Sequence, residues 1–178
     1  MFPVRGLLPL LSLLAVGCQN QAVGVRLRFP SERTFLLTNT VSLSVYDGEG
    51  TGDTSPDAIC RSLSVVSSVA PAGLQPLESS LNQPACGFLD GGVTFDAVET
   101  GRRVFFAEAT SFAGTPVLRG CDVADVYPDP TDDPEAAGLG VTGFVEVQLA
   151  TLPSFPDEQT AACADVAAKC QENLPCVP

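Results

Sequence analysis

Residues 93–109, VTFDAVETGRRVFFAEA, give the clearest indication of the fold class. Apolar and polar residues alternate over 93–98 and again over 103–109, and Glu99-Thr100-Gly101 separates the two runs. A period of two places successive side chains on opposite faces of a β-strand, so the pattern predicts two strands around a tight turn. Because Phe105 and Phe106 are adjacent, we expect one ring in the core and the other on a partly covered outer face.

The same alternation recurs along most of the chain. It is found over residues 23–29, 41–46, 115–123 and 141–149, and residues 59–69 are a candidate for a seventh strand. No ten-residue helical stripe separates any two of the six clear strands, which argues against parallel βαβ units. The expected fold class is therefore all-β, an antiparallel β-sandwich of about seven strands that occupies residues 22–152.

The last 26 positions, residues 153–178, form a cysteine-rich C-terminal segment. Asp157-Glu158-Gln159 places negative charge before an alanine-rich run, Thr160–Gln171, with Lys169 near its end. This charge distribution predicts a short helix. Cys163 and Cys170 are seven positions apart, so they would share one face of that helix. We therefore expect a short cysteine-rich helical tail that needs tertiary or disulfide anchorage.

The run from Val93 to Leu149 resembles the prealbumin-like or carboxypeptidase-regulatory-like sandwiches of secreted proteins. In those modules a strand leads to a glycine turn, then to an aromatic strand and then to a glycine-rich hairpin. The matching positions here are Phe95, Val98, Gly101, Phe105, Ala107, Gly114 and Gly120. The resemblance covers about a third of the chain and implies a β-sandwich without implying a particular activity.

Composition excludes several classes of function. The chain has 178 residues, 9 Lys or Arg against 21 Asp or Glu, a formal net charge of −12, and no His. Without His it has no Ser-His-Asp or Cys-His nucleophile and no His-ligated zinc site. The negative charge disfavours binding to nucleic acid. The hydrophobic share of 45% against 17% charged residues excludes disorder throughout.

The N-terminus has the layout of a secretory signal. Arg5 precedes an apolar run, Leu7–Val16, which ends at Gly17-Cys18. Ten residues of helix reach about 15 Å, roughly half the hydrocarbon core of a bilayer, so this run is too short to span a membrane. An ordinary signal peptide with a cysteine at this place by chance is the alternative.

Leu14-Ala15-Val16-Gly17-Cys18 resembles the lipobox of bacterial lipoproteins. The resemblance implies a signal peptide over residues 1–17, lipidation of the Cys18 thiol, and a lipidated tether over residues 18–21. Ala15 departs from the leucine that is more frequent three residues before the cysteine. Gln19 in place of Asp favours the outer membrane by resemblance to the enterobacterial sorting rule. Several acyl chains on one cysteine would anchor the protein firmly.

Cysteine count agrees with lipidation, because seven cysteines leave an odd thiol that Cys18 accounts for. The remaining six are Cys60, Cys86, Cys121, Cys163, Cys170 and Cys176. The chain has no CxxC, so we expect three structural disulfides rather than redox or metal-binding thiols. Fifteen pairings are possible, and we prefer Cys60 with Cys121, a closure that the chain-entropy model values at roughly 4 kcal/mol.

Two further groups of charged residues are candidate sites. Six carboxylates, Asp122, Asp125, Asp129, Asp132, Asp133 and Glu135, crowd residues 121–135. A solvated acidic loop is the expected interpretation and weak calcium binding the alternative, because the EF-hand spacing is missing. Arg102-Arg103 beside Gly101 is expected to be a solvated hairpin end, with anion binding as the alternative. We expect no metal site and no cofactor.

The sequence therefore predicts a non-enzymatic lipoprotein of the bacterial envelope with a binding or structural role. A calcium- or glycan-binding envelope module is the alternative, and an envelope hydrolase fits less well. The expected partners are the membrane, through Cys18, and membrane-adjacent envelope proteins. Arg26, Arg28 and Arg33 are the only early basic cluster and are expected near the membrane, whereas residues 121–178, with 11 carboxylates against Lys169, should face outward.

Overall fold

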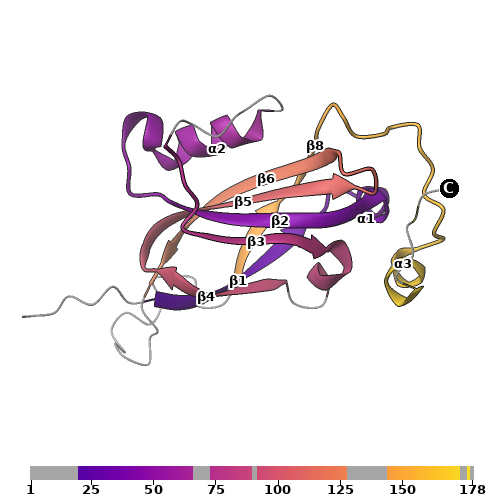
Figure 1. Cartoon of the computed structure of the whole chain (residues 1–178), viewed down its shortest axis with the longest axis horizontal. Helices are drawn as coiled ribbons and strands as arrows, with labels where there is room; N and C mark the ends of the chain where they lie inside the picture. The colour runs from indigo at the N-terminus through magenta and orange to yellow at the C-terminus, as the bar shows by residue number, and fades with distance from the viewer. Residues whose placement is uncertain (1–19, 66–72, 90–91, 128–143, 173–175, 177–178) are drawn as a thin grey trace, which may run out of the picture.

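Two β-sheets form the body of the protein (Figure 1). The structure is a computed structural model that describes residues 20–65, 73–89, 92–127, 144–172 and 176. A three-stranded sheet has the order β4-β1-β7, and a five-stranded sheet has the order β3-β2-β5-β6-β8. The strands are β1 (Asn20–Arg28), β2 (Thr38–Asp47), β3 (Glu78–Pro84), β4 (Val93–Glu99), β5 (Gly101–Ser111), β6 (Pro116–Val126), β7 (Phe144–Gln148) and β8 (Ala150–Thr151). The expectation of a mainly β fold is confirmed.

The three-stranded sheet departs from a purely antiparallel arrangement. β1 is antiparallel to β4 on one side, with Val25 opposite Val93. On its other side β1 is parallel to β7, with Gly24 opposite Phe144 and Arg28 opposite Gln148. Every described pairing in the five-stranded sheet is antiparallel. The first strand of the body therefore lies between two strands that come much later in the chain.

The tight turn at residues 99–101 carries the chain from one sheet to the other. β4 belongs to the three-stranded sheet, and β5 is in the middle of the five-stranded sheet. Gly101 has a φ of 114°, which glycine adopts without the steric cost that a Cβ would impose. β5 then pairs with β2 on one side and β6 on the other.

The main core lies between the two sheets. Its members are apolar residues of both, and among the most completely buried are Val25, Leu43, Phe105, Leu118 and Val147. β6 and β7 approach closely at Gly120, where an added Cβ would lie 2.4 Å from the carbonyl oxygen of Gln148. Glycine at this position therefore lets the two sheets meet at one edge.

A helix covers the outer face of the five-stranded sheet, where the sequence had suggested a seventh strand. Residues 56–64 form α2 (Pro56–Ser64), so the strand interpretation of residues 59–69 is wrong over its described part. Ser55 caps the helix by accepting from the amide of Ala58, and Pro56 occupies the first turn. Ile59 and Leu63, four positions apart, pack against Tyr46 and Val104 in a second core. The remaining short elements are two single turns, η1 (Gly52–Thr54) just before α2 and η2 (Ala85–Phe88) just after β3.

The prediction for the two phenylalanines is confirmed. Phe105 is buried in the main core between the sheets, and Phe106 is partly buried in the second core beneath α2. Strand alternation explains the division, because neighbouring residues of β5 point to opposite faces.

α1 (Glu32–Leu37) and the C-terminal segment lie together at the end of the body opposite the beginning of β1 (Figure 1). The helix predicted over residues 160–171 is shorter, because α3 (Val166–Glu172) begins only after Asp165, whose carboxylate accepts from the amide of Ala168. Cys163 precedes the helix, so the expectation that Cys163 and Cys170 share a helical face is wrong. The first strand also begins at Asn20, two positions earlier than expected.

Candidate functional site

Three disulfides join the six downstream cysteines. Cys60 pairs with Cys121, the pairing preferred from the sequence, and their Cα atoms are 5.5 Å apart. Cys86 pairs with Cys170 at 5.6 Å, and Cys163 pairs with Cys176 at 4.8 Å. These separations lie within the range of unforced disulfides. Cys18 and Gln19 lie outside the described residues, as do residues 1–17.

Arg119 fastens the C-terminal end of α2 to the sheet beside the Cys60–Cys121 bond. Its Nε and Nη2 contact Oε2 of Glu108 at 2.8 and 2.6 Å. Its Nη1 donates to the carbonyls of Leu63 and Val65 at 3.2 and 2.7 Å. A guanidinium has enough donors for both tasks, and cations are stabilised at helix C-termini. The arrangement is a structural clasp, and its donors are occupied by groups of the chain itself.

Arg33 holds the C-terminal segment against α1. One nitrogen, Nη2, lies 2.6 Å from the carbonyl oxygens of Pro156 and Asp157 and 2.9 Å from that of Gln159. The guanidinium also lies 5.0 Å from the ring centroid of Phe155. Arg33 is therefore engaged by residues 155–159 and is not part of a free basic surface.

Lys169, the single lysine of the chain, makes the second contact between α3 and α1. Its side chain is buried, and Nζ donates to the carbonyls of Phe35, Leu36 and Thr38. The ammonium lies 4.5 Å from the ring centroid of Phe35. Burial lowers the pKa of Lys169 from 10.5 to about 8. Three backbone acceptors match the three donors of an ammonium, so this lysine serves as a cap for the last turn of α1.

Arg103 corrects the expectation of two solvated arginines at the turn. Its side chain is 6% exposed, and Nη1 lies 2.8 Å from Oδ1 of Asp47. It also donates to the carbonyls of Glu99, Thr100 and Arg102. Only Arg102 is exposed. Because the donors of Arg103 already bind oxygen atoms of the chain, the pair does not form an anion site.

The three arginines of the early basic cluster lie away from the start of β1, and each contacts another part of the chain. β1 runs away from Asn20, so Arg28 lies eight residues along it, about 26 Å away. Arg26 lies over the ring of Phe144, 3.7 Å from its centroid, and Arg28 pairs with Glu146 at 3.6 Å. Figure 1 shows α3 at the opposite end of the body from the beginning of β1. Arg33 contacts the C-terminal segment at that distant end.

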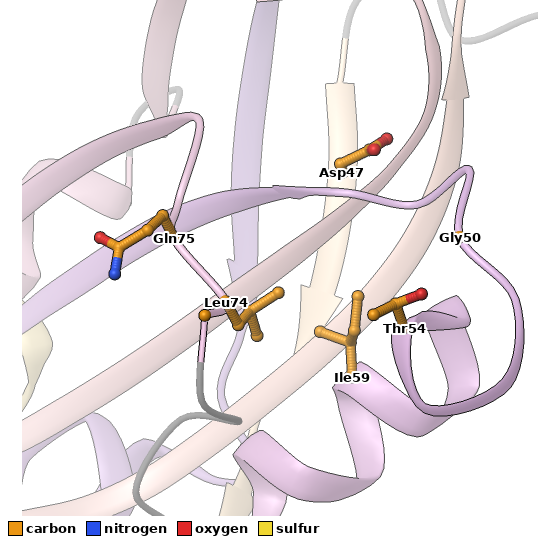
Figure 2. A pocket seen from close by; sticks show the side chains of 7 residues that line it. Asp47, Gly50, Thr54, Ile59, Leu74 and Gln75 are labelled. Carbon is orange, nitrogen blue, oxygen red and sulfur yellow. The ribbon is translucent and has the colours of Figure 1, made fainter.

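A hollow of about 310 Å³ lies between α2 and the end of β2 (Figure 2). It is lined by Asp47, Gly50, Thr54, Ile59, Gly73, Leu74 and Gln75. In Figure 2, Leu74 and Ile59 lie across from each other, Thr54 is beside Ile59, and the amide of Gln75 points away. The volume is at the lower end of the range for small-molecule sites. Among the described residues that line the hollow, Asp47 is the one ionisable group, and Arg103 already pairs with it, so these residues offer no acid–base pair for catalysis.

No metal centre is found among the described residues, since no group of three or more Cys, Asp or Glu side chains converges there. Asp122 and Asp125 lie on β6. Asp129, Asp132, Asp133 and Glu135 lie outside the described residues, so the calcium alternative stays a prediction. Within the described part of the chain, no helix is long and apolar enough to cross a bilayer. No protein-family model, curated protein or solved structure matches this chain.

Proposed function

We propose that the chain is a lipoprotein of the bacterial envelope, anchored through Cys18, with a non-catalytic binding or structural role. The observation that carries this proposal is the lipobox-like stretch Leu14–Cys18 after a basic and apolar leader. Pairing of all six other cysteines supports it, because Cys18 is then the one thiol without an intramolecular partner. Disulfides on this scale are typical of exported proteins.

The body begins very close to the proposed anchor. Asn20 is already part of β1, and two Cα–Cα steps from Cys18 span at most about 7 Å. Such a short tether favours a body that rests against the lipid headgroups, with membrane-adjacent envelope proteins as partners. Gln19 favours the outer membrane. The C-terminal segment, at the opposite end of the body, is then the part placed farthest from the bilayer (Figure 1).

The hydrogen bonds of four cations support a structural or binding role. Arg33, Arg103 and Lys169 donate mainly to backbone carbonyls, and Arg119 divides its donors between Glu108 and α2. These contacts stabilise the body. Among the described residues that line the hollow of Figure 2, Asp47 is the one ionisable group, and it is paired with Arg103. Calcium or glycan binding is the second function that the composition allows.

Lipidation is tested with Cys18→Ala. The parent protein should partition into the detergent phase of a Triton X-114 separation, and the variant should move to the aqueous phase with its three disulfides intact. Cys18→Ser, which is also unable to carry the thioether-linked lipid, is a second variant and should behave in the same way. Partitioning of both variants into detergent would show that the anchor lies elsewhere.

A further inference from the structure

The three disulfides are interlaced along the chain. Numbered in sequence order, the first cysteine pairs with the third, the second with the fifth, and the fourth with the sixth. No cysteine is bonded to the next one along the chain. The sequence separations of the bonded pairs are 61, 84 and 13 residues. In the native pairing, Cys60 and Cys86 are therefore each bonded to a cysteine that is not the nearest one along the chain.

An unfolded chain favours other pairings. Loop closure becomes less costly as the loop shortens, by about 0.6 kcal/mol for each halving. Cys86 is less than half as far from Cys60 as Cys121 is, and Cys170 is nearer than Cys163 to Cys176. Each non-native neighbour is thus favoured about threefold over the native partner in the unfolded state. The native set is also one of fifteen complete pairings.

The fold, and not proximity along the sequence, selects the native partners. Cys60 meets Cys121 only when α2 lies on β6, where Arg119 fastens the end of the helix. Cys86, in η2, meets Cys170 only when α3 is docked at α1 through Lys169. These contacts require α2 and α3 to be docked on the assembled body, whereas thiols can be oxidised as soon as they enter an oxidising compartment.

We propose that this protein is a substrate of a thiol–disulfide isomerase, which it needs in order to replace bonds between neighbouring cysteines by the interlaced set. The inference rests on the proposed export, since disulfides persist in oxidising compartments. The contact is transient, and the enzyme recognises a mispaired chain whose core residues are still exposed.

The exchange conserves electrons. A thiolate of the isomerase attacks the Cys60 sulfur of a Cys60–Cys86 bond, forms a mixed disulfide and releases Cys86 as a thiolate. The Cys121 thiol loses its proton to solvent, its thiolate attacks the Cys60 sulfur and the isomerase thiolate leaves; Cys86 takes up a proton. One protein disulfide is broken and one is formed, so the step consumes no oxidant or reductant.

Two double variants separate interlacing from the simple loss of a bond. Cys86→Ser/Cys170→Ser removes the pair that interlaces with both others, so each remaining native bond joins consecutive remaining cysteines. Cys163→Ser/Cys176→Ser also removes one bond, but it leaves Cys60–Cys121 and Cys86–Cys170 interlaced. Both are made in the full chain with Cys18→Ala, which removes the seventh thiol and makes the assay independent of lipidation.

The reduced, unfolded chains are reoxidised in a glutathione redox buffer with and without protein disulfide isomerase. Samples are quenched with iodoacetamide and their bonds mapped by non-reducing peptide mass spectrometry. The isomerase should accelerate native pairing roughly tenfold in the parent and in Cys163→Ser/Cys176→Ser, because unassisted reshuffling takes up to hours. Adding the isomerase should change the rate of native pairing in Cys86→Ser/Cys170→Ser by less than about twofold.

Equal isomerase dependence in the two double variants, or native pairing of the parent at the same rate without the enzyme, would overturn the proposal. If Cys86→Ser/Cys170→Ser fails to regain its far-UV circular dichroism spectrum, the parent alone decides the question. Its earliest quenched samples should contain mainly Cys60–Cys86 and bonds between neighbours among the last three cysteines. Native bonds from the outset would refute the inference. Failure of the Triton X-114 test would overturn lipidation while leaving this readout intact.

Discussion

Lys169 offers a direct test of how burial and backbone dipoles compete at one ammonium. Burial disfavours the charged form, whereas the three carbonyl acceptors from Phe35, Leu36 and Thr38 favour it. The pKa is lowered from 10.5 to about 8 by burial, so burial dominates. Between these two values the unfolded chain binds more protons than the folded chain, and the free energy of unfolding must rise with pH.

The size of the effect follows from the two pKa values. Between pH 7 and pH 9.5 the lysine should add about 1–2 kcal/mol to the free energy of unfolding, after allowance for residual solvent screening. Lys169→Met keeps most of the apolar stem and removes the titrating group. The two proteins, both with Cys18→Ala, are compared by urea unfolding followed by far-UV circular dichroism, because the chain has no Trp.

The difference in unfolding free energy, parent minus Lys169→Met, should therefore increase across this pH range. A difference that stays constant would mean that the carbonyls hold the pKa at or above its ordinary value, because a raised pKa alters stability only above about pH 10. That result would refute the conclusion that burial dominates. A second variant at the surface, Arg28→Met, should leave the pH dependence unchanged, because its guanidinium is exposed to solvent.

Two further predictions concern the clasp at α2 and the close approach of the sheets. Arg119→Met should lower the free energy of unfolding by about 2–4 kcal/mol, because it leaves the half-buried Glu108 without its cation. The exposed control Arg28→Met should lower it by less than about 1 kcal/mol. Equal losses of the two variants in urea unfolding would contradict the role of Arg119 as a clasp. Gly120→Ala should cost about 1–3 kcal/mol because its Cβ would meet the Gln148 carbonyl, and Gly87→Ala, where a Cβ meets no atom within 4 Å, should stay within about 0.5 kcal/mol.

Strands that alternate clearly could be predicted from the sequence. Residues 105–109 show why: Phe105, Ala107 and Ala109 are buried in the main core, whereas the alternate residues Phe106 and Glu108 are only partly buried on the other face. β3 was missed because Glu78–Pro84 has one large apolar residue, Leu81, and that side chain is 63% exposed. The helix over residues 56–64 does carry a sequence signal, a Ser-Pro start followed by Ile59 and Leu63 at helical spacing.

The polar clasps could not be predicted, and the reason is physical. Arg33 and Lys169 donate chiefly to carbonyl oxygens, which every residue carries, so no pattern of side chains marks their partners. The parallel pairing of β1 with β7 could not be predicted either, because strand periodicity specifies which face is buried but not which strand lies alongside. Among the disulfides, the sequence favours Cys60–Cys121, whereas Cys86–Cys170 depends on where α3 docks and Cys163–Cys176 joins the two ends of the segment around that helix.

The central position of β1 has a mechanical consequence. A pull on the chain ahead of Asn20 acts along the axis of a strand that is hydrogen-bonded to β4 on one edge and to β7 on the other. Backbone hydrogen bonds of a sheet run across the strands, so such a force loads both rows in shear instead of opening them one bond at a time. An edge strand would be peeled away from a single neighbour. A body held by this strand can therefore be dragged by its N-terminus without first losing the strand that attaches it.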